Sequence, residues 1–485
     1  MSPRHSTSLL ARLALVVCLP ACGDDTAKLP ASDAAQPTVQ GDAGPASADA
    51  GRAADAGPGL ADASTSPTDG AVVTSNPDAS AAAALATKSS MLRASSPSTA
   101  NLSALGASNR AFAFDLYHQL SKNADGKNLL FSPYSISTAL AMTYAGARGT
   151  TQSEMKTALH YDLEPGQLHE AFNAADLALA SRGMGKAGAD GTPFRLNVDN
   201  SIWSQKNPDY PVVPAFLDTL AVNYGAGLFQ PDFKADPEGA RGMINGWVSD
   251  RTQKLIPELL PQGSIDMGTR FVLTNTVYFN ASWQKKFMPE KTSDAPFTKL
   301  DGSKVTASMM HEMFSMPYAE GDGYRAVALP YASNELSFVA VLPNQGQHDK
   351  VEAALSGPWF AALTAAWSNK SVELALPKLD YSAKANLNDA LQALGMKAAF
   401  TSSADLSGMS SEPGLEITSV VHQAVIKVIE DGTIAAAATG VVVGTTSVMQ
   451  MDQQITFDRP FFIAIVDAPT GELLFVGRVL DPTGK

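Results

Sequence analysis

The chain has 485 residues, of which 45% are hydrophobic, and a formal net charge of -13. The apolar fraction is that of a globular protein, and the length suits either two or three average domains or one large domain. The negative charge argues against nonspecific binding to nucleic acid or to anionic lipid surfaces, so no nucleic-acid partner is expected. No stretch beyond the N-terminus is long and apolar enough to predict a membrane helix.

The first 21 residues have the pattern of a secretory signal peptide. A positively charged start, with Arg4 and Arg12, overlaps an apolar core over residues 9–20. The four residues that end at Cys22 resemble the bacterial lipobox, in which the cysteine is diacylated and becomes the new N-terminus. Residues 1–21 are therefore predicted to be a lipoprotein signal peptide, with Cys22 as the lipidated anchor.

A plain signal peptide, cut near Ala21, is the alternative and would leave Cys22 as a free thiol. The cysteine count favours lipidation, because the only other cysteine, Cys18, lies inside the signal. The mature protein would then have no disulfide despite its export. Gly23 follows the cysteine, which by the enteric sorting pattern indicates the outer membrane or cell surface. A periplasmic or extracellular location is the alternative.

Residues 22–100 are rich in Ala, Asp, Ser, Pro and Gly and contain almost no aromatic residue. Such a segment cannot bury enough apolar surface to offset the entropy lost on ordering. It is predicted to be a disordered tether, and a coil of ~75 residues spans roughly 50 Å root mean square. The folded domain is predicted to cover residues 101–485.

Apolar periodicity predicts helices over residues 108–121, 149–160 and 165–180. Between the first two, Ser132 and Pro133 open a further helix with a capping residue and a first-turn proline. Alternation then predicts strands over residues 195–204 and 270–287. Near the C-terminus, two more β-rich runs cover residues 420–429 and 455–466.

The segment that joins these last two runs, residues 430–454, is long and made of small and β-branched residues. A loop of this length in a compact domain is usually functional or disordered. Its Val and Thr residues favour extended, paired backbone, although its Ala run could form a short helix. The segment is interpreted as exposed in one state and able to become a strand in another.

This loop resembles the hinge and reactive loop of serpins; taken alone, it could also be an ordinary exposed hairpin. Further segments match the same family, so the resemblance covers about residues 101–485: 128–142, 244–256, 273–283, 327–331, 336–343, 374–378, 394–396, 404–409 and 474–479. It implies an α+β serpin fold with a large central, mostly antiparallel sheet, two further sheets, surrounding helices and an exposed reactive loop.

The resemblance assigns the loop hinge to Glu430 and Gly432, with the glycine as pivot. Thr433 would start a segment that can insert into the sheet. Alternation along a strand would point every second side chain of this segment to the core, and small side chains there favour an inhibitory member. The hinge segment continues through Thr433, Ala435, Ala436, Ala437, Ala438 and Thr439. Of these residues, Thr433, Ala435, Ala437 and Thr439 would face inward.

Family spacing, counted from Glu430, places the cleaved bond at Thr446–Ser447. Because loop length varies, the bonds 443–444, 445–446 and 449–450 remain alternatives. No Lys or Arg lies between Gly432 and Asp458, which disfavours a trypsin-like target. Val, Thr and Met suit the shallow apolar pockets of elastase-like or subtilisin-like serine proteases.

The resemblance also implies a polar cluster under the sheet that controls its opening, made of Ser132, Ser135, Asn275 and His422. His422 would hydrogen-bond across the sheet seam, with Asn275 as its partner. Helix capping is a compatible role for the two serines. Trp283 would lie at the end of the sheet where the loop first inserts, with core packing as its other role.

The predicted function is a suicide-type protease inhibitor, not an enzyme, that acts by loop cleavage and insertion. Alternatives are inhibition of a papain-like cysteine protease, a non-inhibitory serpin with a binding or chaperone-like role and, more weakly, a hydrolase with an unrecognised site. No catalytic triad signature, metal-ligand cluster or phosphate loop is present. No cofactor or metal is expected, and isolated Lys156 and Lys186 argue against a polyanion cofactor. We expect a monomer that contacts membrane only through its lipid.

Overall fold

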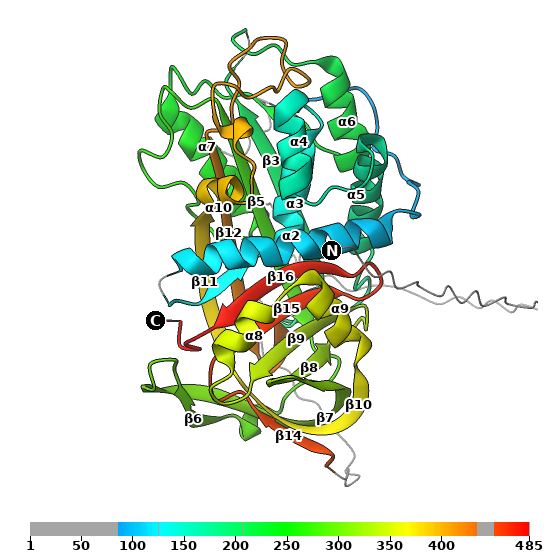
Figure 1. Cartoon of the computed structure of the whole chain (residues 1–485), viewed down its shortest axis with the longest axis vertical. Helices are drawn as coiled ribbons and strands as arrows, with labels where there is room; N and C mark the ends of the chain where they lie inside the picture. Colours follow the sequence, from blue (N-terminus) through cyan, green and yellow to red (C-terminus); the bar gives the residue numbers. More distant parts are fainter. Residues whose placement is uncertain (1–85, 125, 207, 434–450, 485) are drawn as a thin grey trace, which may run out of the picture. The chain divides into compact units, whose positions relative to one another are not determined.

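The computed structural model describes residues 86–124, 126–206, 208–433 and 451–484. They form two large sheets with helices packed around them, as Figure 1 shows. This confirms the predicted α+β class. None of the helices in the described ranges has the length and hydropathy needed to cross a bilayer.

The central sheet has seven strands, and most of its neighbouring pairs are antiparallel. Two pairs are parallel, and one of these joins the long strands at the middle of the sheet. The order across the sheet is β1 (Ala86–Thr87), β4 (Leu228–Phe229), β3 (Arg195–Ser204), β5 (Phe271–Ser282), β13 (Gly432–Thr433), β12 (Ser419–Ile429) and β11 (Leu379–Asn386).

The second sheet has nine strands. The resemblance assigned its strands to two further sheets, but the 18-residue β7 joins them, because it pairs with β10 over most of its length and with β8 at its end. The order is β14 (Gln453–Thr456), β10 (Ser368–Pro377), β7 (Lys304–Gly321), β8 (Tyr324–Pro330), β9 (Leu336–Pro343), β15 (Phe461–Asp467), β16 (Glu472–Val479) and β2 (Leu129–Phe131), with β6 (Ser293–Thr298) beside β7.

The helices pack on the sheets, and α3 is the most central, since all 12 of its residues are buried. It contacts β3 and β5 of one sheet and β16 of the other. The α-helices are α2 (Leu102–Asn123), α3 (Pro133–Tyr144), α4 (Gly149–Ala158), α5 (Pro165–Ala180), α6 (Pro214–Tyr224), α7 (Pro237–Arg251), α8 (His348–Ala354), α9 (Gly357–Ala365) and α10 (Asn388–Ala393), with short 3-10 turns at Pro289–Lys291 and Ala398–Phe400.

Most predicted elements are confirmed, with shifted ends. The strand predicted over 270–287 ends at Ser282, because Trp283 leaves β5 to form an isolated bridge with Tyr331. The run over 455–466 is two strands, β14 and β15, rather than one. Pro460 lies in the break between them, where its missing N–H cannot serve a continuous ladder.

The first residues packed on the domain precede the predicted boundary at residue 101. We call residues 86–100 the N-terminal strap. Its strand β1 pairs with β4, and Arg93 donates hydrogen bonds to Asn173 and Asp176 of α5 at 2.8 and 2.6 Å. Composition could not show this, because the groups that order the strap lie on distant elements. Residues 22–85 of the tether predicted over 22–100, and the signal peptide, lie outside the described residues.

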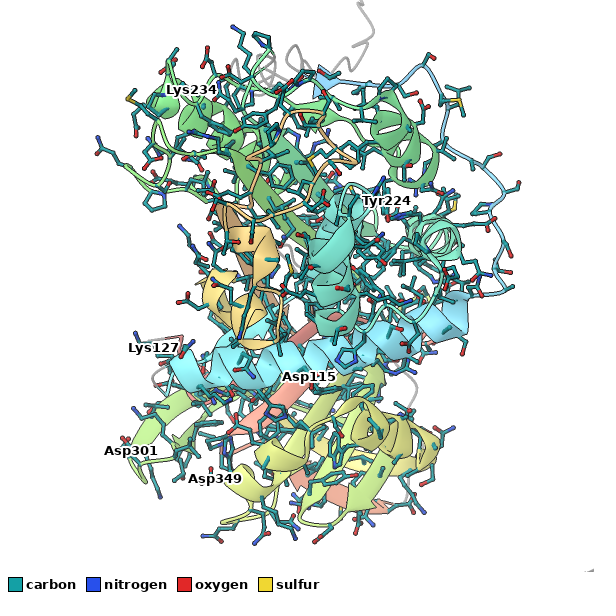
Figure 2. The ribbon with its side chains drawn as sticks, turned by 45° about the horizontal axis from the view of Figure 1, so that its top comes forward. Asp115, Lys127, Tyr224, Lys234, Asp301 and Asp349 are labelled. Carbon is teal, nitrogen blue, oxygen red and sulfur yellow. The ribbon has the colours of Figure 1, made fainter. Side chains whose placement is uncertain are left out.

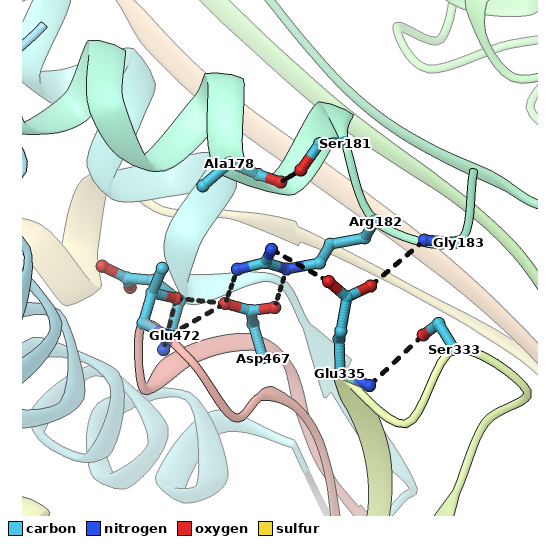
Figure 3. Close-up of polar contacts among 9 residues, drawn as sticks. Ala178, Ser181, Arg182, Gly183, Ser333, Glu335, Asp467 and Glu472 are labelled. Atoms are coloured by element: carbon cyan, nitrogen blue, oxygen red, sulfur yellow. Dashed lines mark hydrogen bonds and ion pairs between the residues drawn. The ribbon is translucent and has the colours of Figure 1, made fainter. Parts of the chain in front are cut away.

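A polar cluster joins the segment that follows α5, the β8–β9 turn and the ends of β15 and β16, as Figure 3 shows. The guanidinium of Arg182 donates to the Asp467 carboxylate at 2.7 Å and to Glu335 at 3.2 Å. The fully buried Glu472 accepts two hydrogen bonds from the Asn109 amide, at 3.1 and 3.0 Å. Burial raises the pKa of Glu472 to about 8, so its carboxyl is largely protonated at neutral pH.

Because the pKa of Glu472 is raised in the folded protein, the free energy of unfolding decreases as pH rises. Between the ordinary value of 4.5 and about 8, the folded protein holds a proton on Glu472 that the unfolded chain has released. We expect a loss on the order of 3–5 kcal/mol across that window. Glu472→Gln, which needs no proton, should flatten the slope in urea unfolding between pH 5 and 9. Equal slopes in both proteins would contradict the assignment.

Candidate functional site

The hinge end of the predicted loop already lies in the central sheet. Gly432 and Thr433 form β13, which is antiparallel to both β5 and β12. Further along, β5 and β12 pair directly, residues 419–423 with 272–276. In the described residues, β5 and β12 therefore meet along a short direct ladder, which we call the seam. The short strand β13 lies between the same two strands at the hinge end.

Gly432 fits this position because the backbone of β5 lies very close. A Cβ atom on Gly432 would overlap the carbonyl oxygen of Ala281 and lie 2.7 Å from the Ala189 Cβ. Such contacts cannot be relieved by a side-chain rotation. The predicted pivot therefore requires glycine for close packing as well as for backbone freedom.

Thr433 points into the core, as predicted, and is 2% exposed. Its hydroxyl is hydrogen-bonded to the Tyr331 hydroxyl at 2.7 Å. The rest of the predicted hinge segment (Ala435, Ala436, Ala437, Ala438 and Thr439), the predicted cleavage residues Thr446 and Ser447, and the anchor Cys22 lie outside the described residues.

The turn Glu430–Asp431, which leads from β12 into β13, is held by charge pairs. Glu430 accepts from Thr292 at 2.7 Å and pairs with Lys378 at 2.8 Å. Burial alone would raise the pKa of Glu430, but these two contacts outweigh it and hold the pKa below its usual value. Asp431 pairs with Lys286 at 2.7 Å.

Trp283 lies at the hinge end of β5, as the resemblance implied. Its indole N–H donates to the carbonyl oxygen of Ile429 at 2.9 Å, and its backbone N–H donates to that of Asp431 at 3.0 Å. The indole also stacks on Tyr331, with ring centroids 4.7 Å apart. Trp283 therefore belongs with the hinge and not with the polar cluster.

The polar cluster lies at the other end of the seam, where His422 is directly opposite Asn275. The imidazole Nδ1–H donates to the Asn275 side-chain oxygen, and Nε2 accepts from the Ser132 backbone N–H at 3.0 Å. Burial lowers the pKa of His422 to about 3. The ring is therefore neutral at physiological pH, with both nitrogens occupied, and cannot act as a general base.

The two serines of the predicted cluster make different contacts. Ser132 is the N-cap of α3, since its hydroxyl accepts from the Ser135 N–H at 3.3 Å, and its own N–H serves His422. Ser135 instead donates its hydroxyl to Asn200 of β3 at 2.9 Å. The predicted cluster therefore extends across β3 through Asn200, which sequence analysis missed.

Sequence analysis also missed the partners that hold the hinge: Lys286, Thr292, Tyr331 and Lys378. Lys286 precedes its partner by 145 residues and Tyr331 by 102, so no local pattern links them. The apolar run that ends at Tyr331 carried a family match but no sign of its contact with Thr433.

A separate group of potential metal ligands, His348, Asp349 and Glu352, has ligand atoms within 4.8 Å of one another. Glu352, however, already accepts from the Tyr117 hydroxyl at 2.6 Å and pairs with Arg478 at 2.8 Å. The Arg478 charge opposes a second cation there, so this group does not support a metal site.

Comparison with known proteins identifies relatives of this chain. The family model "Serpin (serine protease inhibitor)" matches residues 107–482. The chain is 36% identical over 387 residues to leukocyte elastase inhibitor from Bos taurus, covering 78% of this chain and 99% of the relative. It is 37% identical over 374 residues to an uncharacterized serpin-like protein from Thermococcus kodakarensis, covering 77% and 84%.

Two solved structures have the same fold. Human thyroxine-binding globulin, complexed with thyroxine, aligns with a TM-score of 0.71 and 28% identity, covering 79% of this chain and 100% of that one. The thermophilic serpin tengpin in its native state aligns with a TM-score of 0.70 and 29% identity, covering 81% and 97%.

The seam generates a stability prediction for His422. His422→Ala leaves the Ser132 N–H and the Asn275 oxygen buried without their partner, which costs about 1–3 kcal/mol for each group. We expect a lower urea midpoint for the native state. Lys427→Ala, on the same strand but half-buried, is the matched control and should shift the midpoint little. A His422 variant as stable as this control would show that the seam does not depend on the imidazole.

Proposed function

The chain belongs to the serpin family, and we propose that it inhibits its target protease by a suicide mechanism. The protease attacks the loop, forms an acyl bond to it and frees the loop's N-terminal half. That half then inserts between β5 and β12 as a new strand and carries the bound protease with it. The proposed target is an elastase-like or subtilisin-like serine protease.

The observation that supports this mechanism best is β13. Thr433 lies opposite Ala281 of β5 and Val428 of β12, and both neighbours are antiparallel to it. If the strand continues in this register, each further loop residue moves one position along both neighbours. Ala437 would then lie between Val277 and Ala424.

Further insertion reaches the polar cluster. In the same register Thr439 lies between Asn275 and His422, so the seam bond between those two residues must break. The direct ladder of five residue pairs between β5 and β12 would be replaced by two ladders, one on each side of the new strand. Each net hydrogen bond gained contributes about 0.5–1.5 kcal/mol. The native state would then be held by a kinetic barrier and not by its free energy.

The hinge segment has side chains small enough to enter the sheet between β5 and β12. The residues that would face the core beyond Thr433 are Ala435, Ala437 and Thr439, which carry small side chains without charge. A proline would remove a ladder hydrogen bond, and a charge would be costly to bury. Neither occurs, which favours an inhibitory member over a non-inhibitory one.

The target class is proposed from the loop and from the relatives. No Lys or Arg lies between Gly432 and Asp458, and several relatives are named leukocyte elastase inhibitors. We place the cleaved bond at Thr446–Ser447, with the bonds 443–444, 445–446 and 449–450 as alternatives. A papain-like cysteine protease is the second candidate target.

Incubation with pancreatic elastase tests the mechanism. An inhibitor gives a covalent complex that survives SDS, and mass spectrometry of the released C-terminal peptide locates the cleaved bond. Clean cleavage without a complex would instead support the non-inhibitory alternative, a surface protein with a binding or chaperone-like role.

The proposed location is the outer membrane or cell surface, through a lipid on Cys22. Intact-mass analysis of detergent-extracted protein tests it. A diacylated N-terminal Cys22 is expected, whereas an unmodified thiol would exclude the anchor.

Thr433 offers the sharpest test of the hinge. Thr433→Arg would place a cation against Tyr331 in a buried site, so insertion should stall and elastase should turn the protein over as a substrate. We expect the covalent fraction to fall at least tenfold. Thr433→Ser keeps the hydroxyl and should retain most of the complex. An Arg variant with normal complex formation would contradict the assignment of Thr433 as the start of the inserting segment.

Loop cleavage should also change stability. Because the cleaved arm becomes a ladder strand, we expect the nicked protein to unfold well above the intact protein in a thermal scan. The Thr433→Arg variant, nicked in the same way, should show a much smaller rise. An unchanged melting temperature for nicked wild-type protein would exclude insertion.

A further inference from the structure

The connection between α5 and β3 forms a hairpin that packs on the hinge end of β5. The Phe194 N–H closes it by donating to the Lys186 carbonyl oxygen at 2.9 Å. We call residues 186–194 the hinge hairpin. Its residue Ala189 is only 2% exposed, so the hairpin lies against the domain and does not extend into solvent.

Two polar side chains of β5 bind the hinge hairpin. The Asn280 amide donates to the Asp190 carboxylate at 2.7 Å, and its oxygen accepts from the Ala189 N–H at 2.9 Å. The Ser282 hydroxyl donates to the Gly188 carbonyl oxygen at 2.8 Å. Asn280 is fully buried, so loss of its partners would leave a polar amide unpaired inside the protein, which is destabilising.

Asp190 also organises the tip of the hairpin. Its carboxylate accepts from the Thr192 N–H at 2.9 Å and from the Thr192 hydroxyl at 2.7 Å, and Gly191 supplies the positive φ of the turn, 79°. Burial alone would raise the pKa of Asp190, but the bonds from Thr192 and Asn280 outweigh it and hold the pKa below its ordinary value. The carboxylate is therefore ionised at neutral pH, and its bond to Asn280 is charge-assisted.

Ala189 brings the hinge hairpin into contact with β13. A Cβ atom on Gly432 would lie 2.7 Å from the Ala189 Cβ, so the two residues touch. Gly432 is paired with Ser282, and the same serine bonds the hairpin through its hydroxyl. The hairpin therefore covers β13 at the point where it joins β5.

An aromatic chain connects the hairpin to the second residue of β13. Phe194 packs edge-on against Phe279, with ring centroids 6.1 Å apart. Phe279 packs in the same way against Tyr331, at 5.0 Å, and the Tyr331 hydroxyl is the partner of Thr433. Displacement of the hairpin would therefore disturb the surroundings of both residues of β13.

The segment that leads into the hairpin is fixed to the second sheet, as Figure 3 shows. The Gly183 N–H donates to the Glu335 carboxylate at 3.4 Å, and Arg182 donates to Asp467 at 2.7 Å. The hairpin is thus held at its base and at its tip. A strand of two residues has few ladder bonds of its own, so such a fixed cover can decide whether β13 stays in the sheet.

We propose that the hinge hairpin holds β13 in the sheet and so positions the start of the strand that inserts. Asp190 and Asn280 are positioning residues that act through Ala189 on Gly432. This inference rests on the proposed suicide mechanism and adds a part to it. The first pairs of a new strand are the costly ones, so a β13 already in place favours insertion over hydrolysis of the acyl bond.

Asp190→Ala tests the hairpin, with Asp301→Ala as the matched control. Asp301 lies in the β6–β7 turn, where Figure 2 labels it, and accepts from the Ser303 N–H at 2.8 Å and hydroxyl at 2.6 Å. Gly302 follows it with a φ of 80°, so the two turns are built alike, but it is Asp190 that bonds to β5. In the uncleaved protein, we expect amide hydrogen exchange at residues 432–433 to be at least fivefold faster in Asp190→Ala and unchanged in Asp301→Ala.

The same two variants are then titrated against pancreatic elastase. Asp190→Ala should at least double the number of inhibitor molecules consumed for each elastase trapped, because more acyl bonds are hydrolysed before insertion begins. Asp301→Ala should match the wild type. The association rate, corrected for that consumption, should not change in either variant, because elastase attacks the loop and not the hairpin.

An exchange of the two bonded side chains gives a rescue test. Asn280→Asp alone sets two carboxylates against each other and should also speed amide exchange at residues 432–433. Adding Asp190→Asn restores a bond between an amide and a carboxylate, and the exchange rate should return toward the wild-type value. Failure of the double variant to recover would contradict the role of this bond.

A wild-type exchange rate in Asp190→Ala would overturn the proposal, and so would equal acceleration by Asp301→Ala, because the effect would not be local. Faster exchange with unchanged stoichiometry would overturn it too, since the hairpin would then hold β13 without affecting insertion. If wild-type protein forms no covalent complex, the proposed function fails, whereas the exchange measurement still decides whether the hairpin holds β13.

Discussion

The pairing of β5 with β12 is the constraint on which the rest of the molecule depends. These strands form a direct ladder only over residues 419–423 and 272–276, and at the hinge end β13 separates them. One buried imidazole, His422, bridges the ladder to Asn275 and to the first turn of α3. The middle of the sheet is therefore closed by a short ladder and one neutral histidine.

The hinge turn is positioned by contacts that are individually modest. The Lys378–Glu430 and Lys286–Asp431 pairs both involve partly exposed lysines, and such pairs contribute little to stability. Their value is geometric, because they fix where the chain leaves β12. With the Tyr331–Thr433 hydrogen bond, they set the register of β13 between β5 and β12.

Register also connects the loop to the N-terminal strap. Strand β13 begins at the Ser282 end of β5, and the register from Val272 through β3 and β4 leads to β1 of the strap at the other end. The hinge and the seam are thus successive positions along β5.

The sequence by itself determined what depends on neighbouring residues: the helix over 165–180, the strand over 195–204 and the inward face of Thr433. The resemblance to serpins added the prediction that His422 hydrogen-bonds to Asn275. Tertiary structure alone decided that residues 86–100 join the domain, that β7 merges two expected sheets, and that Lys286, Lys378 and Tyr331 hold the hinge. Periodicity and capping act within a few residues, whereas these contacts join groups that come together only when whole elements pack.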